Sequence, residues 1–314
     1  MAAGQERRFQ NARNSRMTNP LAGMYAALLT GLSDKGDFDP ARQKAIDAYV
    51  LGQGLDGLYV GGSSGESGLL GVDELLAQQA VVAESAQGSA ATLIAHVGVP
   101  NLRDSIRLAQ NAQKLGYHGL SALPPHSYPF SDREIFAYYE ALSAATDLPL
   151  IVYEVPVRTG RPFSLDLLGR ILTLPGVGGI KFTSMDLFKF ATLRRRFPEK
   201  TFFFGFDEVY LSGAVMGAHG GIGTTYNLLG RLYAALNEAV KQGSLERAQE
   251  LQTISQRFVE TLMETGVLPG MKAALRLRGV DCGPTRLPLA PLVDDCEARM
   301  SAILANPEIA AWVG

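Results

Sequence analysis

The sequence predicts a parallel (β/α)8 barrel followed by a C-terminal group of helices. From residue 23 onward, eight short and continuously apolar runs alternate with helical patterns. The runs start every 18 to 35 residues, about the length of one strand-helix unit. Continuous rather than alternating apolar runs are typical of strands buried on both faces. A doubly wound open sheet is the alternative, but residues 28–38 lack the GxGxxG turn that it favours.

The expected strands share β-branched, aromatic and glycine residues bounded by turn residues. They cover residues 23–30, 57–62, 92–98, 119–124, 149–155, 177–183, 202–206 and 220–227. Between the first five strands, helical patterns cover residues 39–54, 71–88, 101–116 and 131–146. The first of these opens with Asp39 as the expected N-cap and Pro40 at the first helical position.

After residue 243 the pattern is purely helical. Three helices are expected over residues 245–266, 269–279 and 289–305. We therefore divide the chain into an N-terminal extension (1–21), a barrel (22–243) and a three-helix appendage packed on the barrel (244–314). Four arginines against one acid mark the extension. A disordered tail or an alternative start site is favoured there over an organelle-targeting peptide.

Composition excludes several classes of protein. The 314 residues carry a net charge of −2, which argues against nucleic acid as the main partner. No apolar run approaches the roughly 20 residues that a membrane span needs. Two cysteines without a CxxC spacing fit free thiols in the cytoplasm. The four histidines form no metal-binding pattern, so no metal site is expected.

Lys181 is the candidate catalytic residue. It is the one charged side chain in the sixth apolar run, and it stands at the carboxyl end, where barrel enzymes place their sites. An amine in a partly dry pocket has a lowered pKa, and a neutral lysine can attack a ketone to form a Schiff base. The alternative is a lysine that reaches solvent or pairs with Asp186.

Tyr153 is the expected partner of Lys181. It lies 28 residues earlier, at the same end of the fifth strand. Neighbouring strands are about 4.8 Å apart, so the two side chains can meet. A phenol beside a Schiff-base lysine can move the hydroxyl proton of an aldol step. The alternative is a core aromatic with a satisfied hydroxyl.

A glycine-rich turn follows the second strand. Gly61, Gly62 and Gly65 permit tight backbone geometry, and Ser63 and Ser64 offer hydroxyl and N–H groups to an anion such as a carboxylate. A flexible turn that precedes a helix, with Glu66 or Ser67 as its cap, is the alternative. Further along, Asp207 and Glu208 suit the hydroxyls of a polyol, although acids are also common at helix N-termini.

Five segments occur together in one order: GGSSGE, YEVPVRTG, IKFTS, GFDE and GGIGTTYN. Over roughly residues 22–305 the chain resembles the dihydrodipicolinate synthase / N-acetylneuraminate lyase superfamily of pyruvate-dependent class I aldolases. Within it, the chain is most similar to the N-acetylneuraminate lyase subfamily. This resemblance implies reversible cleavage of N-acetylneuraminate to N-acetylmannosamine and pyruvate, no cofactor beyond the covalent Schiff base, and a homotetramer.

The resemblance also assigns roles to residues. Lys181 would form the Schiff base, Tyr153 would transfer protons, and Ser63 and Ser64 would bind the pyruvate carboxylate. The residues matching contacts to the sugar tail are Thr183, Gly205, Asp207, Glu208 and Thr224.

Four sites depart from the lyase pattern: Glu154, Arg158, Phe182 and the pair His126 and Ser127. Strand alternation points Glu154 away from the barrel interior, so a structural effect is expected there. Arg158 resembles the synthase branch, and Arg158 and Tyr128 are candidates for substrate specificity. The alternatives are a dihydrodipicolinate synthase, a 2-keto-3-deoxy sugar acid aldolase or a non-catalytic barrel that binds sugar acids.

Overall fold

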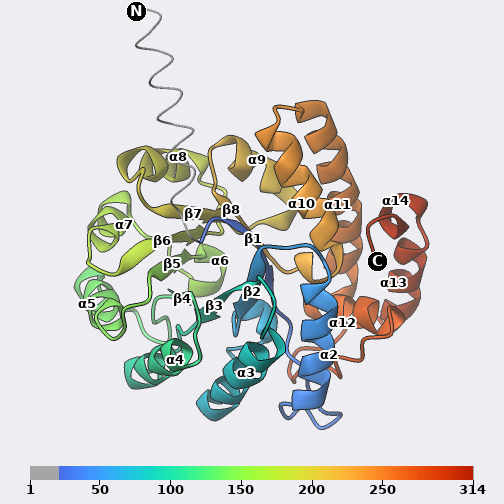
Figure 1. The fold of residues 1–314 in the computed structure, drawn as a ribbon, viewed down its shortest axis with the longest axis horizontal. Coiled ribbons are helices and arrows are strands. Elements are labelled where there is room, and N and C mark those ends of the chain that lie inside the picture. The colour runs from blue at the N-terminus through green and yellow to red at the C-terminus, as the bar shows by residue number, and fades with distance from the viewer. Residues whose placement is uncertain (1–20, 314) are drawn as a thin grey trace, which may run out of the picture.

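The eight expected strands form a closed barrel in the computed structural model, which describes residues 21–313 (Figure 1). Each strand pairs in parallel with the next, and β8 returns to pair with β1. The (β/α)8 prediction is confirmed. The expected N-terminal extension lies, apart from Leu21, outside the described residues.

The strands are short and almost fully buried. They are β1 (Gly23–Ala27), β2 (Gly57–Val60), β3 (Thr92–His96), β4 (Gly119–Ala122), β5 (Leu150–Glu154), β6 (Val177–Phe182), β7 (Thr201–Phe204) and β8 (Gly220–Gly223). The helices that follow β1 to β5 are α2 (Pro40–Leu51), α3 (Val72–Ser85), α4 (Leu102–Lys114), α5 (Asp132–Ser143), α6 (Pro156–Thr159) and α7 (Leu165–Leu172). The remaining helices are α8 (Leu187–Arg196), α9 (Tyr210–Val215), α10 (Tyr226–Lys241), α11 (Leu245–Thr265), α12 (Val267–Leu277), α13 (Cys296–Leu304) and α14 (Pro307–Ala310).

Capping residues set the starts of the barrel helices. Asp39 accepts hydrogen bonds from the amides of Ala41 and Arg42, with Pro40 opening α2 as expected. Ser131 and Glu134 form a capping box at the start of α5. These local signals explain why helix starts in the barrel follow closely from the sequence.

Strand parity separates two cores. One set of alternate residues fills the barrel interior: Tyr25, Ala27, Tyr59, Ile94, Ile151, Phe203 and Ile222. The other set faces the helix layer, where Phe182 packs against Phe190 with ring centroids 5.4 Å apart. Because Tyr153 and Lys181 share the parity of Ile151 and Gly179, both point into the barrel.

The last expected helix begins later than predicted. We expected it over residues 289–305, but α13 starts only at Cys296. Pro291 offers no amide donor, and the Leu292 amide donates to the carbonyl of Thr265 instead of to a helix. In contrast, α12 starts at Val267, two residues early, because Pro269 lies in the first turn, where proline is tolerated.

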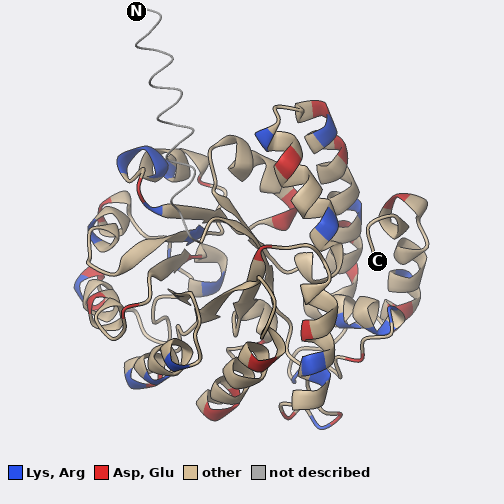
Figure 2. Ribbon diagram, in the orientation of Figure 1, with Lys and Arg blue, Asp and Glu red and all other residues tan. Residues whose placement is uncertain are grey.

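Charged residues lie mainly on the outer helices, where both signs are interspersed (Figure 2). In the eight strands as described, the only Asp, Glu, Lys or Arg side chains are Glu154 and Lys181. Across residues 21–313, no helix combines the length and the apolarity that crossing a membrane requires.

Candidate active site

Lys181 and Tyr153 are direct cross-strand partners at the carboxyl ends of β6 and β5. The Lys181 amine lies 4.1 Å from the centroid of the Tyr153 ring and 4.4 Å from that of Tyr59. Both Lys181 and Tyr153 are 4% exposed. Asp186 instead caps α8 and lies 3.7 Å from the Lys189 amine, so the structure does not support pairing of Asp186 with Lys181.

Burial, and the charge of each group on the other, shift the pKa values of both Lys181 and Tyr153. Burial lowers the pKa of the Lys181 amine, although the charge of Tyr153 and hydrogen bonding to it oppose the change. Burial by itself raises the pKa of the Tyr153 phenol, but the positive charges of Lys181 and Arg158, together with hydrogen bonds to Thr183 and Lys181, outweigh it, and the net pKa is lowered. A more nucleophilic amine therefore faces a more readily ionised phenol.

The two serines lie in a one-turn 3-10 helix, η2 (Ser63–Gly65), directly after β2. The Ser64 hydroxyl lies 2.6 Å from the hydroxyl of Thr224, which follows β8. Thr30 donates to the carbonyl of Gly65 (2.6 Å) and so holds the turn from behind. Two loops thus bring hydroxyl groups to the same side of the Lys181 cavity.

The acidic pair lies in a second 3-10 turn, η3 (Asp207–Val209), after β7. The Asp207 carboxylate accepts hydrogen bonds from the amide and the hydroxyl of Thr225 (2.8 and 2.7 Å). Burial raises the pKa of Asp207 to about 6 in spite of these bonds. Gln252 and Gln256 of α11 donate to the carbonyls of Asp207 and Glu208, so α11 fixes this turn.

One cavity of about 180 Å³ brings together most of the expected residues. It is lined by Lys181, Tyr153, Ser63, Ser64, Thr183, Gly205, Asp207, Glu208, Thr224 and Arg158, all of which the sequence singled out. Gly205 is needed for close packing, because a Cβ there would collide with the Thr183 hydroxyl.

The apolar wall of this cavity was not predicted. It includes Val259, Leu262 and Met263 of α11 and Val267 of α12. Helical periodicity marked part of this surface as buried, but it could not say which face of the barrel the helices cover. The C-terminal helices therefore reach the barrel mouth as well as packing on its outside.

Several residues suspected of setting specificity lie elsewhere. His126, Ser127 and Tyr128 line a separate cavity of about 480 Å³ between the loops after β4 and β5. The Tyr128 side chain is 74% exposed. Within one chain, Tyr128 thus does not contact the Lys181 cavity, and Phe182 is buried in the helix-facing core.

Glu154 points away from the cavity, as strand alternation indicated. Its carboxylate accepts a hydrogen bond from the Phe163 amide (3.2 Å) and lies 3.5 Å from the Lys189 amine. Burial raises the pKa of Glu154 to about 7, and the Lys189 charge only partly offsets this. Glu154 therefore joins β5 to α8 and does not face a ligand.

His96 lies beneath the site and was not predicted to belong to it. The His96 ring packs edge-on against Tyr153 with centroids 6.2 Å apart. Its Nδ1 lies 3.0 Å from the Gly61 carbonyl, and its Nε2 accepts from the Leu123 amide. Burial lowers the pKa of His96 to about 3, so the ring is neutral, and it joins the end of β3 to the loops after β2 and β4. The sequence held one sign of this position: His96 lies two residues after Ile94 on β3, so its side chain also points into the barrel.

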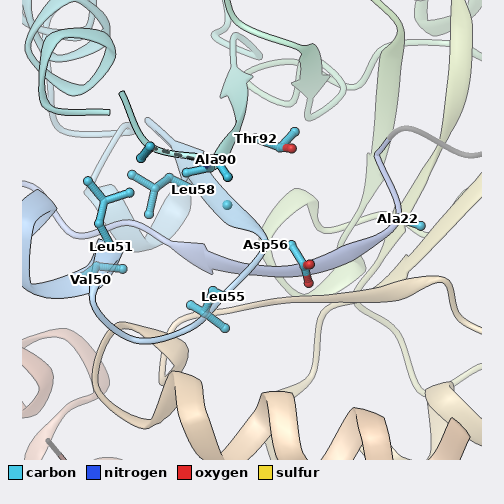
Figure 3. Close-up of a pocket in the computed structure, with 11 residues that line it drawn as sticks. Ala22, Val50, Leu51, Leu55, Asp56, Leu58, Ala90 and Thr92 are labelled. Carbon is cyan, nitrogen blue, oxygen red and sulfur yellow. Dashed lines mark hydrogen bonds between the residues drawn. The ribbon is translucent and has the colours of Figure 1, made fainter. Parts of the chain in front are cut away.

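A third cavity, of about 370 Å³, opens at the amino ends of β1, β2 and β3, the opposite end of the strands from Lys181 (Figure 3). Its walls include the apolar side chains of Val50, Leu51, Leu55 and Leu58 together with the polar residues Asp56, Ser89 and Thr92. The Asp56 carboxylate accepts from the Met24 amide (2.7 Å) and so closes the β1–β2 junction. Chemistry-bearing groups do not converge there as they do around Lys181.

No cluster of three potential metal ligands among His, Cys, Asp and Glu occurs in the described part of the chain. A buried amine, a phenol and paired hydroxyls at the carboxyl face of a (β/α)8 barrel define an aldolase-type enzyme that acts on a keto acid.

The comparisons with known proteins agree with that class. The sequence profile of the Dihydrodipicolinate synthetase family matches residues 20–306, and the chain belongs to this family. An N-acetylneuraminate lyase from Rhizobium meliloti (strain 1021) is 42% identical over 293 residues, which cover 93% of this chain and 96% of that protein.

Two solved structures share the fold closely. The N-acetylneuraminate lyase from Fusobacterium nucleatum complexed with pyruvate superposes with a TM-score of 0.86 at 31% identity, covering 92% of this chain and 98% of that one. A catalytic lysine mutant of a Ruminococcus gnavus sialic acid aldolase has a TM-score of 0.88 at 28% identity, covering 92% and 96% of the two chains.

Proposed function

We propose that this protein is an N-acetylneuraminate lyase that reversibly cleaves N-acetylneuraminate to N-acetylmannosamine and pyruvate. The observation that carries the proposal is the buried Lys181 amine directly opposite Tyr153, in a cavity that is also lined by the serine turn and the acidic turn. Relatives named N-acetylneuraminate lyase, about 40% identical over most of the chain, support the same activity.

The first half of the reaction builds the electron sink. The neutral Lys181 amine attacks the C2 ketone of the open-chain sugar acid, and loss of water leaves an iminium. Ser63 and Ser64, which line the same cavity, hold the adjacent carboxylate by hydroxyl and N–H donors. The iminium draws electrons, so the reaction needs no metal or organic cofactor.

The second half breaks the carbon-carbon bond. The Tyr153 phenolate takes the C4 hydroxyl proton, the C3–C4 electron pair moves toward the iminium, and N-acetylmannosamine leaves. Protonation of the enamine at C3 and hydrolysis of the imine release pyruvate and restore Lys181. The proposed contacts of the sugar tail are Thr183, Gly205, Asp207, Glu208 and Thr224, since they line the same cavity as Lys181.

The wider setting stays a prediction. We propose a homotetramer as the working form and a cytoplasmic location, in keeping with the two free thiols Cys282 and Cys296. The division into a barrel over 22–243 and an appendage over 244–314 is likewise proposed. Small sugar acids are the proposed partners, with no role for nucleic acid or membrane.

Arg158 favours one alternative, a synthase or sugar-acid aldolase of the same family. It lines the Lys181 cavity, and a guanidinium there matches a second carboxylate on the incoming aldehyde. Turnover of aspartate semialdehyde with pyruvate, in the absence of N-acetylneuraminate cleavage, would establish that alternative.

The deciding experiment follows pyruvate release from N-acetylneuraminate with a coupled lactate dehydrogenase. Turnover by the wild type and none by Lys181→Ala is the expected result, because the variant has no nucleophile. Borohydride with pyruvate should add mass at Lys181 in the wild type only. Retained activity in Lys181→Ala would remove the Schiff-base mechanism, and an unmodified wild type would point to a barrel without catalysis.

A further inference from the structure

Glu66 occupies an unusual place directly behind the serine turn. It is the one non-glycine residue with a positive φ (59°) in the described chain, and it forms the left-handed end of η2. Its side chain is fully buried. A glutamate held in a disfavoured conformation and out of water needs specific partners.

Those partners come from the C-terminal helices, more than 200 residues away in sequence. The Lys272 amine of α12 lies 2.7 Å from Glu66 Oε1, with the two side chains 2% and 0% exposed. Lys272 also donates to the carbonyl of Pro284 (2.7 Å). Burial lowers the pKa of Lys272, and the Glu66 charge opposes that change.

A third residue completes the contact. The Arg286 amide donates to Glu66 Oε2 (2.7 Å). The Arg286 guanidinium donates to the carbonyl of Leu69 (2.8 Å) and to the Glu74 carboxylate (2.6 Å). The chain that leads from the serine turn into α3 is therefore fixed by the segment that follows α12.

Other contacts of the turn do not replace this support. Thr30 holds the Gly65 carbonyl, and Gln78 donates to the Thr30 hydroxyl (2.8 Å). The first contact acts on the backbone before Glu66 and the second only holds Thr30, whereas the Glu66 carboxylate is held by the Lys272 amine and by the Arg286 amide. Because a buried charge is poorly tolerated without its partner, losing either member should shift the turn.

We propose that the Glu66–Lys272 ion pair is a positioning device that sets Ser63 and Ser64 on the carboxylate of the keto-acid substrate. The inference rests on the proposed function, in which the serine turn binds that carboxylate. The pair contacts neither Lys181 nor Tyr153, so Schiff-base formation as such is left intact. The C-terminal helices thereby determine keto-acid affinity from the far side of the turn.

The test compares trapping of two ketones at Lys181. The initial rate of cyanoborohydride trapping is measured by intact mass against pyruvate concentration, and again with acetone, which has no carboxylate. The variants are Glu66→Gln, which keeps the shape of the side chain, Lys272→Met, and both together. Arg276→Met is the matched control, since Arg276 lies one turn along α12 and pairs with Glu297 instead.

The expected result is a rise of about tenfold or more in the pyruvate concentration for half-maximal trapping in each single variant, the scale of a lost charge-assisted contact. Acetone trapping should be unchanged, the double variant should recover part of the loss, and Arg276→Met should match the wild type.

Equal losses with pyruvate and acetone would show general damage and overturn the proposal, as would an unchanged pyruvate dependence. Single variants that both fail to fold, judged by circular dichroism, would make the pair a folding determinant and overturn it as well. A wild type that traps no pyruvate would refute the proposed function itself, and the role of the pair would fall with it.

Discussion

The Lys181 amine lies between two phenol rings, and Lys181 is only 4% exposed. Aromatic faces favour a cation, with amine-to-centroid distances of 4.1 and 4.4 Å here, but burial favours the neutral form and lowers the pKa. The Tyr59 hydroxyl donates to the Ser121 hydroxyl (3.0 Å), so Tyr59 is held in place, and of the two tyrosines only Tyr153 lines the cavity. Tyr59 therefore packs against the Lys181 amine from a fixed position, and Tyr153 is the residue proposed to transfer protons.

The first prediction concerns Tyr153→Phe. The variant keeps the ring that packs edge-on against Tyr59 and His96, so folding and pyruvate trapping on Lys181 should persist. We expect kcat for N-acetylneuraminate cleavage to fall by roughly 10²-fold or more, the usual scale of acid-base assistance. Pyruvate release and borohydride trapping measure the two quantities separately.

The control is Tyr25→Phe. Tyr25 also points into the barrel, but its hydroxyl donates to the Leu21 carbonyl at the opposite end of the strands. Removing the Tyr25 hydroxyl should leave kcat close to that of the wild type. If Tyr153→Phe retained full kcat, the proton shuttle would have to be assigned to another residue.

At the scale of the element, β5 performs two tasks through alternation. Tyr153 faces the cavity, and the next residue, Glu154, faces α8. The register that aligns Tyr153 with Lys181 therefore also places the Glu154 carboxylate between Phe163 and Lys189. A change at Glu154 acts on the site only through the strand.

The second prediction uses the pKa of Glu154, which burial raises to about 7 from an ordinary 4.5. The folded state binds this proton more tightly than the unfolded state, so its stabilising effect is complete below pH 4.5 and is lost as pH rises through 7. At 1.36 kcal/mol for each pH unit, the loss is roughly 3 kcal/mol. Because the glutamine in the variant Glu154→Gln cannot titrate, the free energy of unfolding of this variant should not show that loss.

Urea unfolding between pH 5 and pH 8.5 measures this difference. The free energy of unfolding of the wild type should fall with rising pH by more than that of Glu154→Gln. Glu140→Gln, at an exposed position of α5, should follow the wild type. Parallel profiles for wild type and Glu154→Gln would contradict the prediction.

The helices after the barrel show what an element contributes beyond its own packing. Gln252 and Gln256 bind the turn of Asp207 and Glu208, and Lys272 pairs with Glu66 directly behind the turn of Ser63 and Ser64. Two sides of the cavity are therefore fixed from α11 and α12. This arrangement makes the C-terminal segment part of the site and not only a cover for the barrel.

At the scale of the whole molecule, the barrel and its inner residues could be predicted because both depend on short-range patterns. Apolar runs give the strands, and a residue's parity within a run gives its direction, which placed Lys181 and Tyr153 together. The contact of Glu66 with Lys272 joins residues 206 positions apart and has no such local pattern. The Val259 and Met263 wall was missed for the same reason.

The directions of loop side chains were the other feature that the sequence could not predict. His126, Ser127 and Tyr128 follow β4 at the carboxyl face, where a site is expected, yet they line a separate cavity. Their direction is set by the loop's own turns and not by strand parity, so position along the chain could not place them. The start of α13 was misplaced likewise, because Leu292 bonds to a distant carbonyl.

The third prediction concerns the proposed homotetramer. Large apolar side chains are exposed near the carboxyl ends of β5 and β6, with Val157 at 80% and Phe188 at 81%. Burying a phenylalanine side chain is worth about 1.5 to 3 kcal/mol, so such residues suit a contact between chains. Light scattering coupled to gel filtration should give the wild type a mass of four times 33.7 kDa.

Phe188→Glu should shift that mass toward smaller species as the protein is diluted, because a charge replaces an apolar contact at each copy of the interface. Leu245→Glu, which alters an exposed apolar residue at the start of α11, is the matched control and should leave the mass unchanged. A wild type that runs as a single chain at micromolar concentration would refute the tetramer. A tetramer unaffected by Phe188→Glu would place the interface on another face of the barrel.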